Sequence, residues 1–395
     1  MAESPAIAPS QKRKNLAVFL DGTWNAVDSN TNVWRMKSLC APVSKDGAPQ
    51  LIYYDVGVNG VVGGMLGKGL NKNVQEAYEW LIDNYSLGDH IFIFGFSRGA
   101  YTARSLAGLI SKHGILKPGA PLGVAQLYER YKRSDDRTIW KLREQEEKGT
   151  LKDVTLEERW LLKYSQRVPI KAVAVWDTVG ALGVPALSIE GISRSTLGFL
   201  HTGLRLSIEN GYHALAIDEH RKAFAPTLWS VRKPKDVNAV YAAPRSIGSV
   251  EQRWFVGAHA NVGGGCESDL LAQIPLRWIM NKSSHHGLAF RSDIEIDGDV
   301  VSAPISDSYK EFMRGAYSKV FRRHYRVIGP GPEQREDGTH TNVNETIDAS
   351  VFERWRARKE YRPENLINWS KAKQVDPATL KTSILAESPS VAVPD

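Results

Sequence analysis

A serine with the spacing of a catalytic nucleophile stands out in the sequence. Ser97 lies between Gly95 and Gly99 in the pattern G-x-S-x-G, after the apolar run 91–94 and before a small-residue helical pattern that reaches about Lys112. A tight turn between strand and helix exposes such a serine, and its flanking positions leave no room for side chains. The helix N-terminus behind it would favour developing negative charge. The pattern therefore predicts Ser97 as a nucleophile, with a small-residue packing turn as the alternative.

A serine nucleophile needs a histidine base and a carboxylate that orients the histidine. In folds of this kind the chain order is Ser, then acid, then His, each after a strand. Asp177 ends the apolar run 172–176, with a helix cap or turn residue as the alternative. Of the ten histidines, only His259 both follows an apolar strand and enters a glycine loop. His213 and His220 lie in a helical pattern, which leaves core or surface roles open.

Ester hydrolysis also needs two backbone N–H groups aimed at the developing oxyanion. One should belong to Arg98, directly after the nucleophile. The second should come from the loop after the first strand, where Gly22 and Thr23 are both candidates. Asp21 and Asn25 belong to the same loop and are expected to support it.

Short apolar runs that alternate with helical patterns must position these residues. Alternation of this kind predicts an α/β fold with a mostly parallel sheet flanked by helices, as in α/β-hydrolases. The expected strands cover residues 15–20, 51–54, 90–94, 171–176 and 253–256, and one expected helix covers 73–84.

Two segments interrupt the alternation of expected strands and helices. Residues 126–167 are dense in charge and predict a helical insertion, and 180–212 mix small, apolar and basic residues; we expect both to cap the pocket. Residues 1–14 are expected to be a disordered leader. One hydrolase domain should span 15–328, followed at 329–395 by a polar extension that is partly packed and disordered at its end.

Composition narrows the class of protein. The 395 residues are 42% hydrophobic and 24% charged, which excludes a wholly disordered chain, and two cysteines form at most one disulfide. No apolar run reaches the ~18 residues of a membrane span, and the polar N-terminus has no signal-peptide core. A cytoplasmic site of synthesis is expected.

The net charge of +7 indicates an anionic partner or merely a solvated basic face. The nearest basic block is 322–326, and no nucleic-acid motif accompanies it.

Three other chemistries are excluded by single positions. Phe19 stands where an aspartate-nucleophile phosphatase would carry its nucleophile. Lys68 is followed by Gly69 rather than Ser or Thr, and Val62 replaces a required glycine, so the glycine-rich stretch is no phosphate loop. No metal-ligand spacing is present, so neither a metal nor a cofactor is expected. Buried hydrogen-bonding roles are favoured over cation binding for three further acids, Asp21, Asp55 and Asp218.

Four segments together resemble the DUF2235 family, an α/β-hydrolase group that contains the catalytic domain of type VI secretion lipase effectors of the Tle1 type. They are 19–25, 95–100, 176–180 and 259–265. Two more stretches, 54–58 and 214–229, are also similar to the family's signatures. The resemblance covers about residues 15–280.

The resemblance implies a Ser–Asp–His triad at Ser97, Asp177 and His259 and ester hydrolysis, with membrane phospholipids as substrates in the effector branch. It also implies export by a signal-independent secretion system. Asn261 departs from the family, which usually has an acidic residue there; the change could alter how His259 is oriented. No counterpart of the large C-terminal membrane-docking domain of the best-known effectors is found in these 395 residues.

The residues and the resemblance together predict a serine hydrolase that cleaves carboxylic esters through an acyl-enzyme. A lipase or phospholipase acting on glycerophospholipids is favoured, with peripheral contact to a membrane surface as a further expectation. A short-chain carboxylesterase or thioesterase is the first alternative. The second is a non-catalytic protein that keeps the hydrolase fold and binds anionic lipid or a protein partner; an incomplete triad would be its sign.

Overall fold

The computed structural model of the protein describes residues 13–22, 30–57, 65–133, 136–179, 207–235, 245–266, 270–335 and 338–394. Thr23 and Asn25, both predicted to belong to the site, lie outside these residues. So do most of the segment 180–212 and the first twelve residues of the expected leader. Lys14 is described, and its backbone N–H donates to Asp89 Oδ1 over 2.8 Å.

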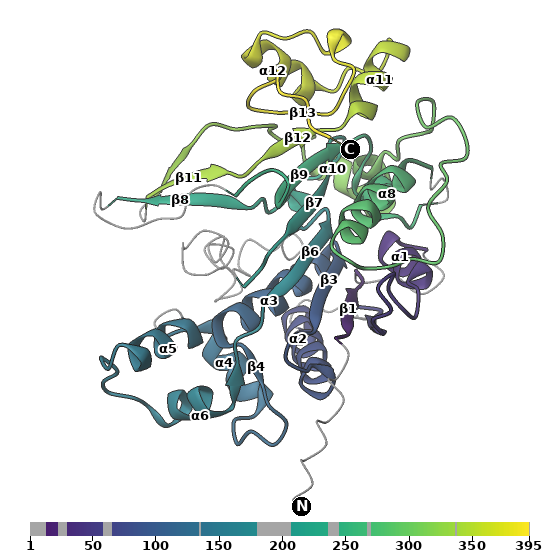
Figure 1. The fold of residues 1–395 in the computed structure, drawn as a ribbon. Helices are drawn as coiled ribbons and strands as arrows, with labels where there is room; N and C mark the ends of the chain where they lie inside the picture. Colours follow the sequence, from purple (N-terminus) through teal and green to yellow (C-terminus); the bar gives the residue numbers. More distant parts are fainter. Residues whose placement is uncertain are drawn as a thin grey trace, which may run out of the picture.

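A sheet of eight strands runs through the described structure in the spatial order β13-β12-β9-β7-β6-β3-β1-β2 (Figure 1). All neighbouring strands are parallel except β12 and β13. This topology confirms the predicted α/β class. The strands are β1 (Asn15–Leu20), β2 (Gln50–Asp55), β3 (His90–Phe96), β6 (Ile170–Trp176), β7 (Gly211–Ala216), β9 (Val250–Phe255), β12 (Glu345–Ile347) and β13 (Ile384–Leu385).

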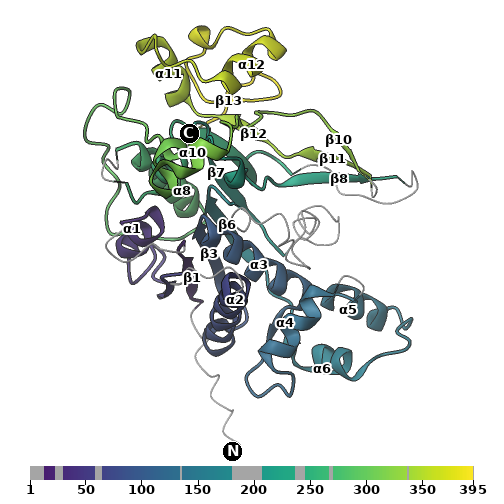
Figure 2. The ribbon, with the colours of Figure 1, turned by 180° about the vertical axis from the view of Figure 1, so that it is seen from behind.

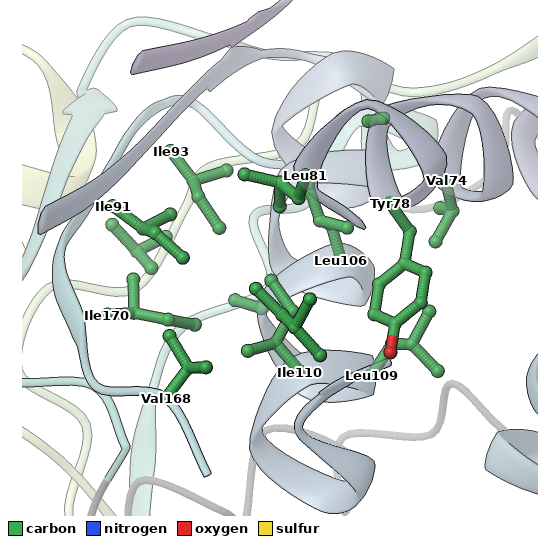
Figure 3. Packing of buried hydrophobic residues seen from close by; sticks show 14 of the residues in the cluster. Val74, Tyr78, Leu81, Ile91, Ile93, Leu106, Leu109, Ile110, Val168 and Ile170 are labelled. Atoms are coloured by element: carbon green, nitrogen blue, oxygen red, sulfur yellow. The ribbon is translucent and has the colours of Figure 1, made fainter. Parts of the chain in front are cut away.

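Both faces of the sheet are covered, which explains why its strands read as continuous apolar runs. Successive side chains point to opposite faces. Leu16 and Val18 therefore join one buried cluster, and Ala17 and Phe19 join the other. Figure 3 shows the first cluster, where isoleucines of β3 meet side chains of two covering helices.

Helices lie on each face of the sheet. The first cluster is covered by α2 (Met65–Asn84) and α3 (Arg98–His113), and the second by α1 (Asn32–Leu39) and α8 (Leu270–His285). Figures 1 and 2 show α1 and α8 on the opposite side of the sheet from α3. The short helix α7 (His259–Gly263) packs between β7 and α8.

The carboxyl ends of the central strands form the edge that carries the predicted site. Phe96 of β3 pairs with Trp176 of β6, so Ser97 and Asp177 follow adjacent strands at the same level. Ala216 of β7 pairs with Phe255 of β9, whose continuation leads to His259. The register of the sheet thus brings three segments of distant sequence to one edge.

The expected helical insertion is present, but its position does not favour the predicted cap role. Its ends pair with each other between α3 and β6, at the edge where the strands begin. The 16 residues of α3 separate this edge from Ser97 by about 24 Å. Its helices pack on the outer side of α2 and α3 (Figure 1). The elements are β4 (Ile115–Leu116), α4 (Val124–Lys132), α5 (Ile139–Glu147), α6 (Leu156–Tyr164) and β5 (Ser165–Gln166).

The chain beyond residue 328 continues the sheet, so the predicted boundary at 328 falls inside a sheet-forming unit. β12 pairs with β9, and β13 adds an antiparallel edge. The sequence predicts disorder for the last residues, but the structure shows Val393 buried, with its N–H donating to the Ser383 carbonyl. The helices of this region are α11 (Ala349–Ala357), α12 (Glu364–Lys373) and η5 (Pro377–Thr379).

Further short elements connect the strands on the site side and in a projecting arm. The arm is a three-stranded antiparallel sheet (Figure 2). These elements are η3 (Lys222–Phe224), β8 (Ser230–Pro234), α9 (Ser308–Glu311), η4 (Phe312–Gly315), α10 (Ala316–Val320), β10 (Glu333–Arg335) and β11 (Gly338–Asn342). Among the described residues, no helix combines the length and apolar character needed to cross a bilayer.

Candidate active site

Ser97 occupies the sharp turn between β3 and α3. Its φ is +58°, a conformation that non-glycine residues rarely adopt, and its N–H donates to the Trp176 carbonyl over 3.1 Å. A Cβ on Gly95 or Gly99 would lie less than 3.0 Å from backbone atoms of the turn or of the β1 end. The two glycines of the motif are therefore required by close backbone approach, which explains the G-x-S-x-G spacing.

Of the three residues predicted as a triad, Ser97 and Asp177 each lie within hydrogen-bonding distance of His259. His259 Nε2 is 2.9 Å from Ser97 Oγ, and His259 Nδ1 is 2.6 Å from Asp177 Oδ2. An ionised carboxylate only accepts hydrogen bonds, so Nδ1 carries the proton and Nε2 is left to accept from the serine hydroxyl. This is the tautomer that a general base needs.

A buried arginine, Arg326, binds the carboxylate of Asp177 with both arms of its guanidinium. Nη1 donates to Oδ1 over 2.6 Å and Nη2 to Oδ2 over 2.9 Å. The same nitrogens donate to the carbonyls of Ala216 and Phe224. Burial alone would raise the pKa of Asp177, but Arg326 and the hydrogen bond from His259 outweigh it and hold that pKa below its ordinary value. Asp177 is therefore kept ionised.

The backbone and ring of His259 are held by a second group of contacts. Its N–H donates to Glu219 Oε2 over 3.2 Å. Its ring lies between those of Phe96 and Phe224, at centroid distances of 4.7 and 5.1 Å. Glu219 is itself bound by the Arg221 guanidinium, and although burial raises the pKa of this carboxyl, Arg221 lowers it to about 2. The histidine is thus fixed at both its ring and its backbone.

His213, left open by the sequence, is a core histidine. It is fully buried in β7, and its Nε2 accepts from the Thr178 N–H over 3.0 Å. Burial lowers its pKa to about 3, so it is neutral and free to accept. It therefore supports the turn after Asp177 rather than acting on Ser97.

The loop after β1 lies against the nucleophile turn, as an oxyanion loop should. The position of a Cβ on Gly99 would fall less than 3.0 Å from the Asp21 carbonyl oxygen. The Gly22 N–H, however, donates to Asp21 Oδ1 over 2.8 Å and is therefore engaged within its own loop. Asp21 Oδ2 accepts from the hydroxyls of Thr31 and Tyr54. Asp21 thus ties both ends of the loop together, the hydrogen-bonding role that the sequence favoured.

Arg98, the other predicted oxyanion donor, is the first residue of α3 and follows Ser97 directly. Its side chain is buried, and burial lowers its pKa to about 10, so it keeps its charge at neutral pH. Its backbone position at the start of the helix is the one from which an N–H faces the nucleophile.

Asn261, the departure from the family pattern, does not contact the His259 ring among the hydrogen bonds of the described residues. Its Oδ1 accepts from the N–H groups of Ala258 and Ser306 over 3.1 and 3.0 Å, and its Nδ2 donates to Ser306 Oγ. A carboxylate could accept the first two bonds but could not donate the third. Asn261 therefore braces the turn before His259 against the segment that contains Ser306.

A second buried carboxyl, Asp218, lies close to the site without touching the triad. Its Oδ2 accepts from the Gly257 N–H over 2.8 Å and from the Tyr361 hydroxyl over 3.2 Å. Burial raises its pKa to about 6. Asp55 also has a hydrogen-bonding role, since its Oδ1 accepts from the Gly57 N–H. Among the described residues, no group of His, Cys, Asp and Glu could hold a metal ion.

The sequence reasoning missed Arg326, Glu219 and Tyr361. The sequence places Arg326 only in the basic block 322–326, which indicates either an anionic partner or a solvated basic face. Glu219 lies in the stretch 214–229, which is similar to a signature of the family. No local pattern of catalytic residues marks Arg326 or Tyr361, and the signature stretch by itself assigns no role to Glu219. One available signal was the demand of a buried aspartate for a counter-charge.

Comparison with known proteins gives a match to one family model and a similarity to a curated yeast protein. The model of the family "T6SS, Phospholipase effector Tle1-like, catalytic domain" matches residues 14–282, more than half of the chain. The uncharacterized protein YEL023C of Saccharomyces cerevisiae is 26% identical over 239 residues, which cover 54% of this chain and 32% of the yeast protein. The chain thus spans about a third of the length of this curated relative.

Two solved structures are similar at low identity. An uncharacterized protein from Pseudomonas aeruginosa is 15% identical, with a TM-score of 0.41, over 71% of this chain and 46% of that one. The Tle1 effector bound to the VgrG spike of the type 6 secretion system is 16% identical, with a TM-score of 0.32, over 65% and 52%. The match over residues 14–282 shows the family: the chain belongs to the family described as "T6SS, Phospholipase effector Tle1-like, catalytic domain".

Proposed function

We propose that the chain is a serine hydrolase that cleaves carboxylic ester bonds of glycerophospholipids through Ser97, His259 and Asp177. The observation that carries the proposal is the position of His259, with one ring nitrogen 2.9 Å from Ser97 Oγ and the other 2.6 Å from Asp177 Oδ2. The match to a phospholipase catalytic-domain family supports the proposed substrate class.

In this mechanism His259 Nε2 takes the proton of Ser97 Oγ as the oxygen attacks the ester carbonyl. The negative charge that develops on the carbonyl oxygen is stabilised by the Arg98 N–H and by a second amide of the loop after β1. The candidates for this second donor are Gly22, whose N–H already donates to Asp21 Oδ1, and Thr23. The imidazolium then protonates the leaving alcohol, and water, deprotonated by His259, releases the acyl group from Ser97.

The ionised Asp177 stabilises the imidazolium at each step. Arg326 reduces this stabilisation by sharing the carboxylate charge, yet it prevents protonation of Asp177 in a fully buried position. Because a protonated acid could not orient His259 in the required tautomer, we assign Arg326 as a positioning residue.

The family also bears on the route by which the protein leaves the cell that makes it. Effectors of the type VI system are secreted without a cleaved signal, and we propose the same signal-independent export for this chain.

The test is hydrolysis by the Ser97→Ala variant. We expect activity on a soluble p-nitrophenyl ester to fall by roughly 10³-fold or more, together with loss of labelling by a fluorophosphonate probe. Ser38→Ala is the matched control, because Ser38 is exposed and, among the described residues, its hydroxyl donates only to the Trp34 carbonyl. Undiminished hydrolysis by Ser97→Ala would overturn the proposal.

The substrate class needs its own measurement. Acyl release from phosphatidylglycerol or phosphatidylethanolamine vesicles is compared with hydrolysis of tributyrin. A preference for the vesicles supports a phospholipase. Activity confined to short-chain esters would make the protein a carboxylesterase or thioesterase with the same triad.

A further inference from the structure

A surface segment beside the triad combines exposed apolar side chains with basic ones. Residues 308–327, called here the 308–327 segment, contain α9, η4 and α10. Val320, Phe321 and Val327 are 75%, 53% and 64% exposed, respectively. Large apolar side chains at such exposure are costly in water when they gather in one place, and they commonly mark an interaction surface.

The charge of the 308–327 segment selects the partner. Arg314, Lys319 and Arg322 are exposed and make no ion pair within the described residues. Lys310 and Arg323 share the carboxylate of Asp307, just before the segment. The only acidic residue inside the segment is Glu311. Apolar side chains flanked by unpaired cations fit the boundary between the acyl chains and the headgroups of an anionic bilayer.

The 308–327 segment is also joined to the triad at both of its ends. The Ser308 hydroxyl donates over 2.9 Å to Glu219, the carboxylate that accepts the His259 N–H. Near the other end, Arg326 binds Asp177. The exposed residues Val320 and Phe321 thus lie between two anchors of the catalytic groups.

A continuous row of aromatic rings links the exposed residues to His259. The Phe224 ring lies 5.1 Å from the His259 ring and 5.6 Å from Phe312; Tyr317 lies 5.6 Å from Phe312 and 4.6 Å from the exposed Phe321. Figures 1 and 2 both show α10 beside α8 and the β7–β9 part of the sheet. A surface that holds Phe321 would therefore lie next to the triad.

We propose that the 308–327 segment docks the protein on anionic phospholipid bilayers, with Val320 and Phe321 inserted at the headgroup boundary and Arg314, Lys319 and Arg322 facing lipid phosphates. The proposal rests on the proposed function, since it names the surface from which that site would take its substrate. A headgroup-level contact beside His259 would present ester bonds to Ser97 without full extraction of the lipid.

The experiment measures binding separately from hydrolysis. Ser97→Ala protein, which leaves the lipids intact, is floated with vesicles of phosphatidylcholine alone or of equal parts phosphatidylcholine and phosphatidylglycerol. We expect binding to the anionic vesicles, weakened by high salt. Val320→Ser/Phe321→Ser should lower the partition coefficient at least roughly tenfold. Lys319→Gln/Arg322→Gln should lower it roughly tenfold on the anionic vesicles alone.

Matched controls exist at the opposite edge of the molecule. Leu87 and Leu156 are 83% and 59% exposed, so Leu87→Ser/Leu156→Ser removes equally exposed apolar side chains far from the 308–327 segment. This variant should bind like its parent. Equal binding to both kinds of vesicle, or unchanged binding of Val320→Ser/Phe321→Ser, would overturn the proposal.

The two proposals fail in different ways. If Ser97-dependent ester hydrolysis is found but no vesicle binding, the docking proposal is wrong, the proposed hydrolase stands, and the 308–327 segment is assigned to a protein partner. The opposite result is that vesicles are bound through the 308–327 segment, but the parent protein with Ser97 intact cleaves neither soluble esters nor lipids. The docking proposal then stands and the proposed hydrolase function is wrong.

Discussion

Two buried aspartates follow adjacent strands of the sheet, and their pKa values are shifted in opposite directions. Asp177, after β6, is bound by Arg326 and His259, and its pKa lies below the ordinary value. Asp218, after β7, is bound by a backbone N–H and the Tyr361 hydroxyl, and burial raises its pKa to about 6. Burial acts on both carboxyls in the same direction. The difference therefore comes from the partner, a guanidinium in one case and a phenol in the other.

This difference shows how one edge of a sheet can hold a buried carboxyl whose pKa is lowered beside one whose pKa is raised. Arg326 and Tyr361 both lie beyond residue 282, outside the part of the chain that matches the family model. The matched part therefore contains the triad residues, while the rest of the chain decides the charge of the acid. Variants of these four residues can break or sharpen the comparison.

The largest effect is expected for Asp177→Asn. The amide cannot act as the ionised acceptor of His259 Nδ1–H, so the imidazole loses both its tautomer preference and the charge that stabilises it. We expect kcat/KM on a soluble ester to fall by about 10⁴-fold. Asp218→Asn is the matched control, whose kcat/KM should stay within about tenfold of the parent. Similar losses in the two variants would remove the distinction between the carboxyls.

Arg326→Met should have the next largest effect. Loss of the guanidinium leaves Asp177 buried without a counter-charge, which costs about 3–5 kcal/mol in the free energy of unfolding. Burial then raises the pKa of Asp177, so the acid limb of the pH profile of kcat/KM should move to higher pH. We expect kcat/KM at neutral pH to fall by about 10²-fold. This loss is smaller than that expected for Asp177→Asn, in which His259 loses its tautomer preference.

Arg326→Lys provides the readout that separates positioning from folding. The ammonium keeps the charge but cannot bind both carboxylate oxygens in the same plane. Its acid limb should therefore stay near that of the parent although kcat/KM is only partly restored. An unshifted acid limb in Arg326→Met would contradict the role assigned to Arg326.

Asp218→Asn should change the pH dependence of stability. A carboxyl whose pKa is higher in the folded protein binds its proton more tightly there, so Asp218 destabilises the fold as pH rises from its ordinary pKa of 3.8 to its folded-state pKa of about 6. Asp177 acts in the opposite sense, contributing stability that is present above the ordinary pKa of aspartate and lost as pH falls below it.

Urea unfolding of the parent and Asp218→Asn measures this contribution. Relative to the variant, the parent should lose about 3 kcal/mol of unfolding free energy between about pH 4 and about pH 7. A constant difference across this range would mean that Asp218 is ionised throughout.

Tyr361→Phe should have the smallest effect. The change removes one hydrogen bond to Asp218 Oδ2 and keeps the ring, so we expect about 1 kcal/mol of lost unfolding free energy and unchanged ester hydrolysis. The pKa of Asp218 should rise, because a donor to its charged form is lost. A large loss of activity would contradict this expectation. It would show that the hydrogen bond between Tyr361 and Asp218 affects the position of His259 through Gly257.

The parallel sheet and the nucleophile turn could be predicted because their signals are local. Ser97, its two glycines and the apolar run before it lie within a few consecutive residues, and backbone sterics alone require that arrangement. Asp177 and His259 could be selected because parallel strands end at one edge, and the chain order left few candidates. The cap role of 126–167 could not be judged, since the sequence does not state at which edge an insertion is anchored.

The sequence by itself determined the strand–helix alternation, the strained turn at Ser97 and the family, because each depends on neighbours along the chain. Only the tertiary structure decided which charges meet. Arg326 lies 149 positions from Asp177 and Tyr361 lies 143 from Asp218, and no spacing rule connects them. Their encounters follow from the addition of β12 and β13 to the sheet and from the return of the chain over the site. Electrostatic interaction depends on distance in space and on burial, and neither is written in the local pattern of residues.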